Sequence, residues 1–328
     1  MNRRKFTKNS TLGALSLSVM GLGCNGAKRL SLPSTANESF EPFFKLSLAQ
    51  WSLHKPMLSG DMSPYDFAAK ASDLGFEGLE YVIGLFSRSY TEVPHLLSAI
   101  KKMSGRLLMN AKKHQMESLI IMVDGEGDLG IQDKAKRIEG VLNHYKWIDM
   151  AQYIGCHSIR VNLFGDGSYD HQADAAADSM ARLADYAKDL DISIIVENHG
   201  GLSSDPKWLR EVLNSVNRSN IGTLPDFGNF CIEREGGQRW NAPCINEYSD
   251  IYKGVKLMMP YAKGVSAKSY AFDTEGNETR IDFKRMLQVV KDAGYQGFIG
   301  VEYEGEDNPE KGILATKDLL LKAAANLD

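Results

Sequence analysis

The stretch of sequence that decides the fold is ISIIVENHGG, Ile192 to Gly201. Its apolar run ends abruptly in a carboxylate, an amide and an imidazole, as a buried strand does when its carboxyl end opens into a reactive pocket. Carboxylates end two later apolar runs in the same way, at Asp226, Glu302 and Glu304. Several parallel strands would thus bring carboxylates to one mouth, which predicts a metal site.

Short apolar runs alternate with longer amphipathic stretches from residue 43 onward. The runs that we expect to be strands are 44–54, 75–84, 118–123, 156–165, 192–201, 223–230, 263–270 and 297–305. The stretches that we expect to be helices are 64–75, 96–113 with an interruption at Gly105, 133–153, 173–190, 205–216, 246–258, 281–293 and 308–326. Eight strand-then-helix units at this length favour an α/β fold with a single (β/α)₈ TIM barrel, residues 43–328, over a doubly wound sheet. The polar segment 233–242 is expected to be an active-site loop.

Composition and missing motifs narrow the function. The 328 residues carry a formal net charge of −4, with a pI near 6.0 and no cluster of lysine and arginine. Such a chain offers no basic surface to nucleic acid, so a small polar substrate is expected instead. No glycine fingerprint follows the first strand and no Walker sequence is present, so a dinucleotide or nucleotide cofactor is not supported.

The N-terminus has the pattern of an export signal. Arg3 and Arg4 precede a short uncharged run, as in twin-arginine signals, so residues 1–28 are assigned to a signal and residues 29–42, rich in Ser and Pro, to a flexible tether. The predicted location is the periplasm or cell envelope, with the chain either free or lipid-anchored at Cys24. The alternative is a surface helix with a basic tip. The sequence does not indicate the oligomeric state.

The other cysteines carry less information. Cys156 precedes a predicted strand and is expected to be a small buried hydrophobe. An exported setting would permit a disulfide between Cys231 and Cys244, but we do not expect one from the sequence, and their spacing matches no metal signature.

Alternation along the strands predicts which side chains face the mouth of the barrel. If Glu197 points inward, so does His199, and the same rule pairs Glu302 with Glu304 and Ser266 with Lys268. The further side chains expected at this mouth are those of Glu80, Arg160, Asn162 and Asp226. Trp51 and His54 end the first strand, where they form either an aromatic wall for a sugar face or part of the core.

The predicted carboxylate cluster calls for a counter-charge. Carboxylates at Glu197, Asp226 and Glu302 would repel one another, and a divalent cation removes that penalty. Oxygen ligands favour Mg²⁺ or Mn²⁺, and a nearby imidazole would admit Zn²⁺ or Co²⁺. The alternative is that these carboxylates only form ion pairs with Arg160 and Lys268.

Two basic side chains have candidate catalytic roles. Lys268 is either an ammonium that stabilises a developing enolate oxygen or a Schiff-base nucleophile, and the surrounding carboxylates favour the charged form. His199 lies close to the cluster and is expected to bind a substrate hydroxyl or transfer a proton. Four other histidines are expected to have structural roles: His95, His114, His144 and His157.

The segments VENHGG, PDFGNF, residues 264–278 and AGYQGFIGVEYEG resemble the xylose isomerase-like superfamily of TIM barrels, the sugar phosphate isomerases/epimerases, from residue 43 to the C-terminus. This resemblance implies a divalent ion held by Glu197, Asp226 and Glu302, with Ser266 at or near the position where many members carry a histidine ligand. Endonuclease IV belongs to the same superfamily, but this chain lacks its many histidines and a basic surface.

The resemblance also implies an activity on carbohydrates. In the epimerases of the family two metal-bound glutamates move a proton at the carbon beside a carbonyl, and Glu197 and Glu302 would have these roles, with a Lewis-acid metal lowering the cost of the enediolate. The expected function is a metal-dependent sugar isomerase or epimerase. A lyase or hydrolase of 3-keto-glycosides and a non-catalytic carbohydrate-binding barrel are the alternatives.

Overall fold

Eight parallel strands form the central sheet of the computed structural model, which describes residues 40–91 and 93–327. The strands of this sheet are β1 (Lys45–Ala49), β2 (Gly78–Val82), β3 (Glu117–Met122), β4 (Ser158–Val161), β5 (Ser193–Glu197), β6 (Ile221–Leu224), β9 (Val265–Ser269) and β10 (Phe298–Tyr303). Their order is β6-β5-β4-β3-β2-β1-β10-β9. The predicted signal, Cys24 and all but residues 40–42 of the predicted tether lie outside the described residues.

The two outer strands of this order, β6 and β9, close the sheet into a ring. Parallel bridges join Thr223 to Ala262 and Asp226 to Ser266. The Ser266 amide donates to Pro225 O at 2.9 Å, and the Phe227 amide donates to Ser266 O at 3.1 Å. We call this junction, residues 223–227 with 262–266, the seam. Its closure confirms the predicted (β/α)₈ barrel.

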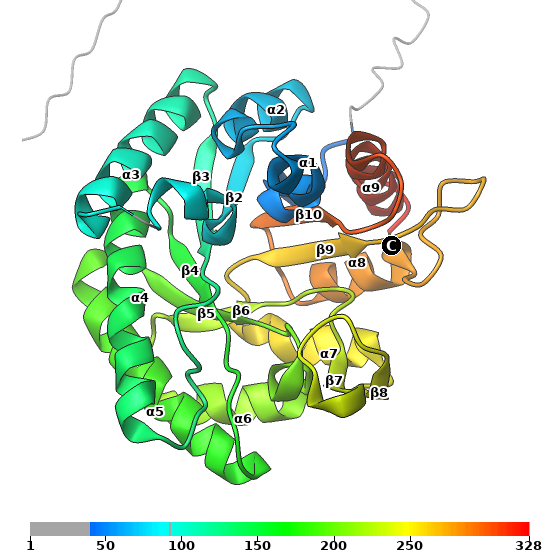
Figure 1. Cartoon of the computed structure of the whole chain (residues 1–328). Helices are drawn as coiled ribbons and strands as arrows, with labels where there is room; N and C mark the ends of the chain where they lie inside the picture. The colour runs from blue at the N-terminus through cyan, green and yellow to red at the C-terminus, as the bar shows by residue number, and fades with distance from the viewer. Residues whose placement is uncertain (1–39, 92, 328) are drawn as a thin grey trace, which may run out of the picture. The chain divides into compact units, whose positions relative to one another are not determined.

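Helices surround the ring of strands (Figure 1). The α-helices are α1 (His54–Ser59), α2 (Phe67–Asp73), α3 (Leu96–Lys113), α4 (Lys134–Ile154), α5 (Tyr169–Ala187), α6 (Pro206–Val216), α7 (Ile251–Met258), α8 (Phe283–Asp292) and α9 (Pro309–Ala324). Side chains cap several helix starts by accepting backbone N–H groups, at Asp133, Ser168, Asp205, Asp282 and Asn308. The interruption predicted at Gly105 is wrong, because α3 runs through it. Among the described residues, no helix has the length and apolar character of a membrane span.

A short antiparallel hairpin is inserted after β6. Its strands are β7 (Cys231–Arg234) and β8 (Cys244–Glu247), and a disulfide joins Cys231 to Cys244. The expectation of no disulfide is therefore wrong, and the loop predicted at 233–242 is the outer part of this hairpin. The predicted start of the next helix at residue 246 is also wrong, because β8 extends to Glu247 and the Asp250 side chain caps α7.

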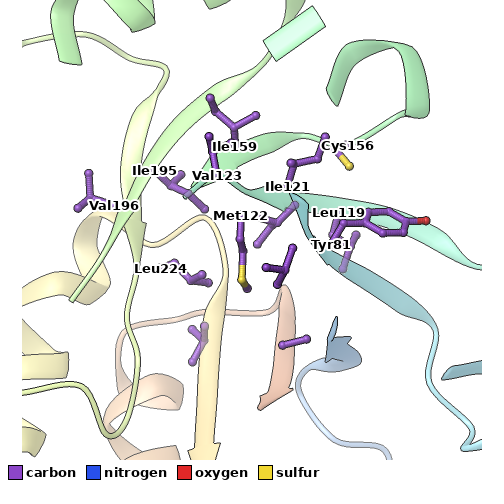
Figure 2. Packing of buried hydrophobic residues seen from close by; sticks show 14 of the residues in the cluster. Tyr81, Leu119, Ile121, Met122, Val123, Cys156, Ile159, Ile195, Val196 and Leu224 are labelled. Atoms are coloured by element: carbon purple, nitrogen blue, oxygen red, sulfur yellow. The ribbon is translucent and has the colours of Figure 1, made fainter. Parts of the chain in front are cut away.

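Buried apolar side chains fill the space between the strands and helices and the lower part of the ring. Figure 2 shows side chains from successive strands, among them Tyr81, Ile121, Ile159 and Val196. A Cβ added at Gly264 would lie 3.0 Å from Ile120 Cδ1 and 3.0 Å from Leu224 Cδ1, so glycine there leaves room for the inner side chains. Cys156 is buried, as expected. The carboxyl ends of the strands, above this core, carry the polar side chains.

Candidate active site

A cavity of about 910 Å³ opens at the carboxyl ends of the strands. Of the residues expected at the mouth, those that line it are Trp51, Arg160, Asn162, His199, Lys268, Glu302 and Glu304. The lining does not include His54, Glu80, Glu197 or Asp226. Glu197 and Asp226 are buried next to Glu302, so the cavity reaches the predicted carboxylate cluster through Glu302.

The three predicted ligand carboxylates lie together. One oxygen each from Glu197, Asp226 and Glu302 falls within 4.8 Å of the others, and all three side chains are buried. The backbone fixes Asp226: its Oδ1 accepts from the amides of Gly228 and Asn229, both at 2.8 Å. The β5, β6 and β10 strands thus deliver one carboxylate each to a single point.

Ser266 lies between two of these carboxylates. Its Oγ is 2.7 Å from Asp226 Oδ2 and 2.9 Å from Glu302 Oε2. A hydroxyl has one hydrogen to donate, so it satisfies only one of the two oxygens at a time. The second oxygen needs a proton of its own or a cation. The donor set therefore fits a divalent cation held by three carboxylates, with the Ser266 oxygen at hand as a further ligand.

Two basic side chains contact the carboxylate cluster. Lys268 Nζ lies 3.1 Å from Glu302 Oε1 and 3.2 Å from Glu304 Oε2. Arg160 Nε lies 3.1 Å from Glu197 Oε2, although this nitrogen makes no hydrogen bond of good geometry. The ion pairs considered as an alternative to a metal are therefore present.

Ion pairs alone leave the site strongly negative. The side chains that meet there are five carboxyls and two cations: Asp124, Glu197, Asp226, Glu302 and Glu304 with Arg160 and Lys268. If all were ionised, three negative charges would remain, although the side chains of Asp124 and Glu304 are 38% and 35% exposed. Burial of unpaired carboxylates is costly, and a divalent cation would cancel two of these charges.

The pKa shifts reflect this crowding. Burial raises the pKa of Glu197 well above its usual range, and the neighbouring carboxylates add to the effect against the opposing charge of Arg160. Burial and the Glu302 charge raise the pKa of Asp226 to about 6. For Lys268, burial lowers the pKa, but the carboxylates of Glu302, Asp226 and Glu304 outweigh it and hold the pKa well above its usual value. Lys268 is therefore an ammonium.

His199 is held in one tautomer by a polar chain. Arg160 Nη1 donates to Asn162 Oδ1 at 3.1 Å, and Asn162 Nδ2 donates to Asp124 Oδ1 at 2.6 Å. Asn162 Oδ1 therefore accepts from His199 Nδ1, which lies 2.9 Å away, and this assignment leaves Nε2 without a proton. Burial and the Arg160 charge lower the pKa of His199 to about 3. A neutral imidazole with one free acceptor nitrogen suits contact with a substrate hydroxyl.

Trp51 and His54 occupy different positions relative to the cavity. Trp51 lines it and donates from Nε1 to Glu304 Oε1 at 2.8 Å. His54 stacks on the Trp51 ring with centroids 4.3 Å apart, and its Nδ1 lies 2.6 Å from Trp51 O. Trp51 is thus placed as an aromatic wall, and His54 supports it from behind.

Glu80 lies inside the barrel, away from the cavity where we expected it. Its Oε1 accepts from Ser47 Oγ at 2.7 Å, and its Oε2 is buried with no hydrogen-bond partner. A Cβ at Gly300 would overlap the Glu80 carboxyl, so glycine at 300 makes room for it. Burial raises the pKa of Glu80 to about 7. The prediction that the Glu80 side chain points into the barrel is confirmed, whereas the prediction that it lies at the mouth is wrong.

Several cavity residues were not predicted individually: Asp124, Phe164, Asn229, Arg239, Trp240 and Tyr270. Arg239 and Trp240 lie in the segment 233–242, which was expected to be an active-site loop. Asp124 directly follows β3, so its place at a strand end was a usable signal. Asn229 follows PDFG in a turn, so the alternation rule for strands does not apply to it. Its Nδ2 donates to Glu197 Oε1 at 3.2 Å. Trp240 comes from the hairpin, and no periodicity in the sequence points to it.

The sequence matches the family model for the xylose isomerase-like TIM barrel over residues 68–323. The chain belongs to this family. No curated protein matches the sequence of this xylose isomerase-like barrel.

Solved structures share the fold of this xylose isomerase-like barrel at low sequence identity. A D-tagatose 3-epimerase-like protein is 16% identical, with 85% of this chain and 97% of that chain covered and a TM-score of 0.60. The 3-keto-D-glucoside 4-epimerase from E. coli is 12% identical, with 85% and 99% covered and a TM-score of 0.62. The IOLI protein, solved with a bound zinc atom, is 13% identical, with 87% and 99% covered and a TM-score of 0.59. At such identities the likeness concerns the fold.

Proposed function

We propose that this protein is a metal-dependent isomerase or epimerase of a carbohydrate, which moves a proton at the carbon beside a carbonyl. One observation carries the proposal: the buried group of Glu197, Asp226 and Glu302 opens into the cavity through Glu302, with the Lys268 ammonium beside it. The names of solved relatives that act on sugars support the substrate class.

The cation would be held by Glu197, Asp226 and Glu302. When bound, it would polarise the carbonyl and hydroxyl oxygens of the sugar as a Lewis acid. The bound zinc atom in the IOLI protein supports a metal in a barrel of this fold. Mg²⁺, Mn²⁺, Co²⁺ and Zn²⁺ are all compatible with the oxygen ligands and the nearby imidazole.

Glu302 is assigned the first proton transfer, because it is the carboxylate of the three that lines the cavity. As the carbon–hydrogen bond breaks, negative charge develops on the carbonyl oxygen, and the Lys268 ammonium stabilises it. Glu304 contacts Lys268 and Trp51 and keeps that ammonium in position.

Glu197, protonated before the reaction, is assigned to give its own proton to the other side of the reacting carbon, while Glu302 keeps the proton that it has taken. The Oε2 atom of Glu197 lies 3.1 Å from Arg160 Nε, in a contact that lacks hydrogen-bond geometry. His199 and Asn162 line the same part of the cavity and are assigned to substrate hydroxyls. Arg160 then remains paired with Asp124, at 2.7 Å.

Deuterium exchange tests this function. The metal-loaded protein is incubated in D₂O with a panel of free sugars and 3-keto-glycosides, and mass spectrometry follows deuterium at the carbon beside the carbonyl. We expect incorporation with at least one substrate, and loss of roughly 10²-fold or more in rate for Glu302→Gln, since general acid–base catalysis contributes about 10²–10⁴-fold.

The products separate the remaining alternatives. A new sugar epimer or isomer supports the proposal, whereas release of the glycosidic substituent identifies a lyase or hydrolase. Exchange with no sugar at all would contradict an enzymatic role and favour a carbohydrate-binding barrel.

A further inference from the structure

The cavity extends well beyond the carboxylate cluster. Its volume of about 910 Å³ is near the upper end of the ~300–1,000 Å³ range of small-molecule sites and exceeds what one sugar ring needs. The cavity lining also includes Phe164, Arg239 and Trp240, which none of the proposed proton transfers uses. These three side chains are therefore available to a part of the substrate other than the reacting carbon.

Phe164 and Trp240 form an aromatic corner. Their ring centroids are 5.5 Å apart and nearly perpendicular, at 87°. A Cβ placed on Gly200 would lie 3.6 Å from an edge atom of each ring, so both rings converge on the glycine that follows His199. Trp240 remains 42% exposed, so part of its indole is free to contact a ligand.

Arg239 fixes this corner from the outside. Its guanidinium lies over the Phe164 ring at 4.6 Å and forms a two-point ion pair with Asp128, including a hydrogen bond of 2.9 Å to Oδ1. The β7–β8 hairpin that carries Arg239 and Trp240 is cross-linked by Cys231–Cys244 and by Arg234 Nη1, which donates to Ala242 O at 2.8 Å. The segment that carries Arg239 and Trp240 is therefore held in place by a disulfide and a hydrogen bond.

Three side chains connect the corner with Glu197 of the reaction centre. The centroids of the His199 and Trp240 rings are 4.7 Å apart, and His199 bonds to Asn162, which bonds to Arg160 beside Glu197. A sugar whose hydroxyl contacts His199 would direct its substituent toward Trp240.

We infer that Phe164, Arg239 and Trp240 form a second subsite, which binds a ring attached to the reacting sugar through its glycosidic oxygen. The substrate is then a glycoside or oligosaccharide rather than a free monosaccharide, and its reacting sugar keeps a carbonyl, either at a free reducing end or as a keto group on the ring, because a glycosidic bond at the anomeric carbon removes the carbonyl there. The attached ring is recognised by its apolar face, which is either the C–H face of a second sugar or an aromatic aglycone, packed on the indole. This inference rests on the proposed carbohydrate function and specifies its substrate class.

Paired glycosides test the subsite. Isothermal titration measures the affinity of the metal-loaded full chain for methyl and phenyl glycosides of glucose, galactose and xylose, and for the disaccharides in which a second glucose replaces the phenyl group. We expect ring-bearing ligands to bind more tightly than the methyl glycoside of the same sugar. Trp240→Ala should remove about 2- to 12-fold of that preference, the range expected for an aromatic contact.

Two variants serve as controls. Trp240→Phe keeps an aromatic face and should retain most of the preference, and Tyr153→Ala, which removes a 49%-exposed ring from α4 outside the cavity lining, should retain all of it. The phenyl and disaccharide arms report whether an aryl group or a sugar fills the subsite, and a Trp240-dependent preference for either supports it.

Other outcomes overturn the inference. Equal weakening of methyl and ring-bearing ligands by Trp240→Ala would place Trp240 at the reaction centre and exclude a second subsite, as would a wild-type protein without preference. A Trp240-dependent preference without deuterium exchange would keep the subsite and overturn only the catalytic function. Absence of binding to every carbohydrate would overturn both.

Discussion

Ser266 stands at the position where the resemblance to sugar isomerases implies a histidine, and its surroundings explain why a small residue fits there. Its backbone belongs to the seam, and its hydroxyl reaches both Asp226 and Glu302. An imidazole would need the space between these carboxylates. Oxygen ligands thus dominate this site, which shifts the expected metal preference toward hard cations.

The carboxylates can be tested one at a time. Glu197→Gln, Asp226→Asn and Glu302→Gln each remove a charged oxygen, so each should lower the bound metal, by roughly tenfold or more in affinity, as measured by elemental analysis after dialysis against buffered metal. Glu275→Gln, an exposed glutamate, is the control. Unchanged metal content in all three variants would rule out this ligand set.

Glu80 should make stability depend on pH. Its pKa is raised from 4.5 to about 7 in the folded protein, so between these values the unfolded chain is ionised while the folded chain keeps the proton. Stability therefore falls as pH rises through this window. Glu80→Gln removes the effect, and its free energy of unfolding relative to wild type should increase by up to about 3 kcal/mol between pH 4.5 and 7. Urea denaturation at several pH values measures it, and a difference that stays constant with pH would contradict it.

The error over Glu80 shows how far residue patterns can be used. Alternation along a strand tells which face a side chain occupies, and it placed Glu80, Arg160 and Lys268 inward correctly. It does not tell at which layer of the barrel a side chain lies, because that depends on the stagger of neighbouring strands. The register shift between Leu79 and Glu80 in the β2–β3 pairing is such a detail.

At the scale of elements, the strands that form the barrel were predictable because apolar runs of four to six residues ended in polar turns. The β7–β8 hairpin was not, since its strands have four residues each and β8 is exposed throughout. Long-range pairing and a disulfide hold it, and neither leaves a periodic signal. The segment 233–242 was expected to be an active-site loop and does contribute residues to the cavity lining, but the packing of Trp240 against Phe164 was not predicted.

The loop after β9 depends on one buried carboxylate. Glu278 accepts the amides of Arg280 and Ile281 at 2.5 Å each, and those of Tyr270 and Ala271 at 3.3 and 3.4 Å. Tyr270 and Arg280 both line the cavity. This one side chain therefore sets the shape of the cavity wall between β9 and α8.

Replacing Glu278 by alanine should leave these buried amides without partners. We expect a loss of about 1–3 kcal/mol in the free energy of unfolding, together with weaker substrate binding, because Tyr270 and Arg280 lose their position. Denaturant titration and calorimetry measure the two effects. Lys284→Ala, on the exposed start of α8, is the control, and a Glu278→Ala variant as stable as this control would disprove the role.

At the scale of the whole barrel, the seam and the reaction centre coincide. The other neighbouring strands share ladders of several paired residues, whereas β6 and β9 meet through isolated bridges, one of which joins Asp226 to Ser266. A cation held by Asp226 and Glu302 would tie the two sides of this junction together.

Hydrogen exchange should therefore distinguish the seam from the rest of the ring. In metal-free protein we expect the amides of Phe227 and Ser266 to exchange faster than those in β3, and added Mg²⁺ to slow them more than it slows β3. Mass spectrometry of peptides covering 223–227 and 262–266 measures this. Uniform slowing along the chain would show that the seam is no weaker than the other strand pairs.

The disulfide in the β7–β8 hairpin would connect the proposed preference for ring-bearing glycosides with the predicted export of the chain. The predicted twin-arginine signal lies outside the described residues, and export remains a prediction; that route carries folded proteins out of a cytoplasm that keeps thiols reduced. Cys231 and Cys244 would then be linked only after crossing, and the Trp240 corner would gain its brace outside. Replacing both cysteines by serine should lower the affinity for ring-bearing glycosides more than the affinity for methyl glycosides, as measured by titration. Affinities equal to those of the wild-type protein would contradict this prediction. A newly made chain would thus bind ring-bearing glycosides weakly in the cytoplasm and would gain its preference for them only after export.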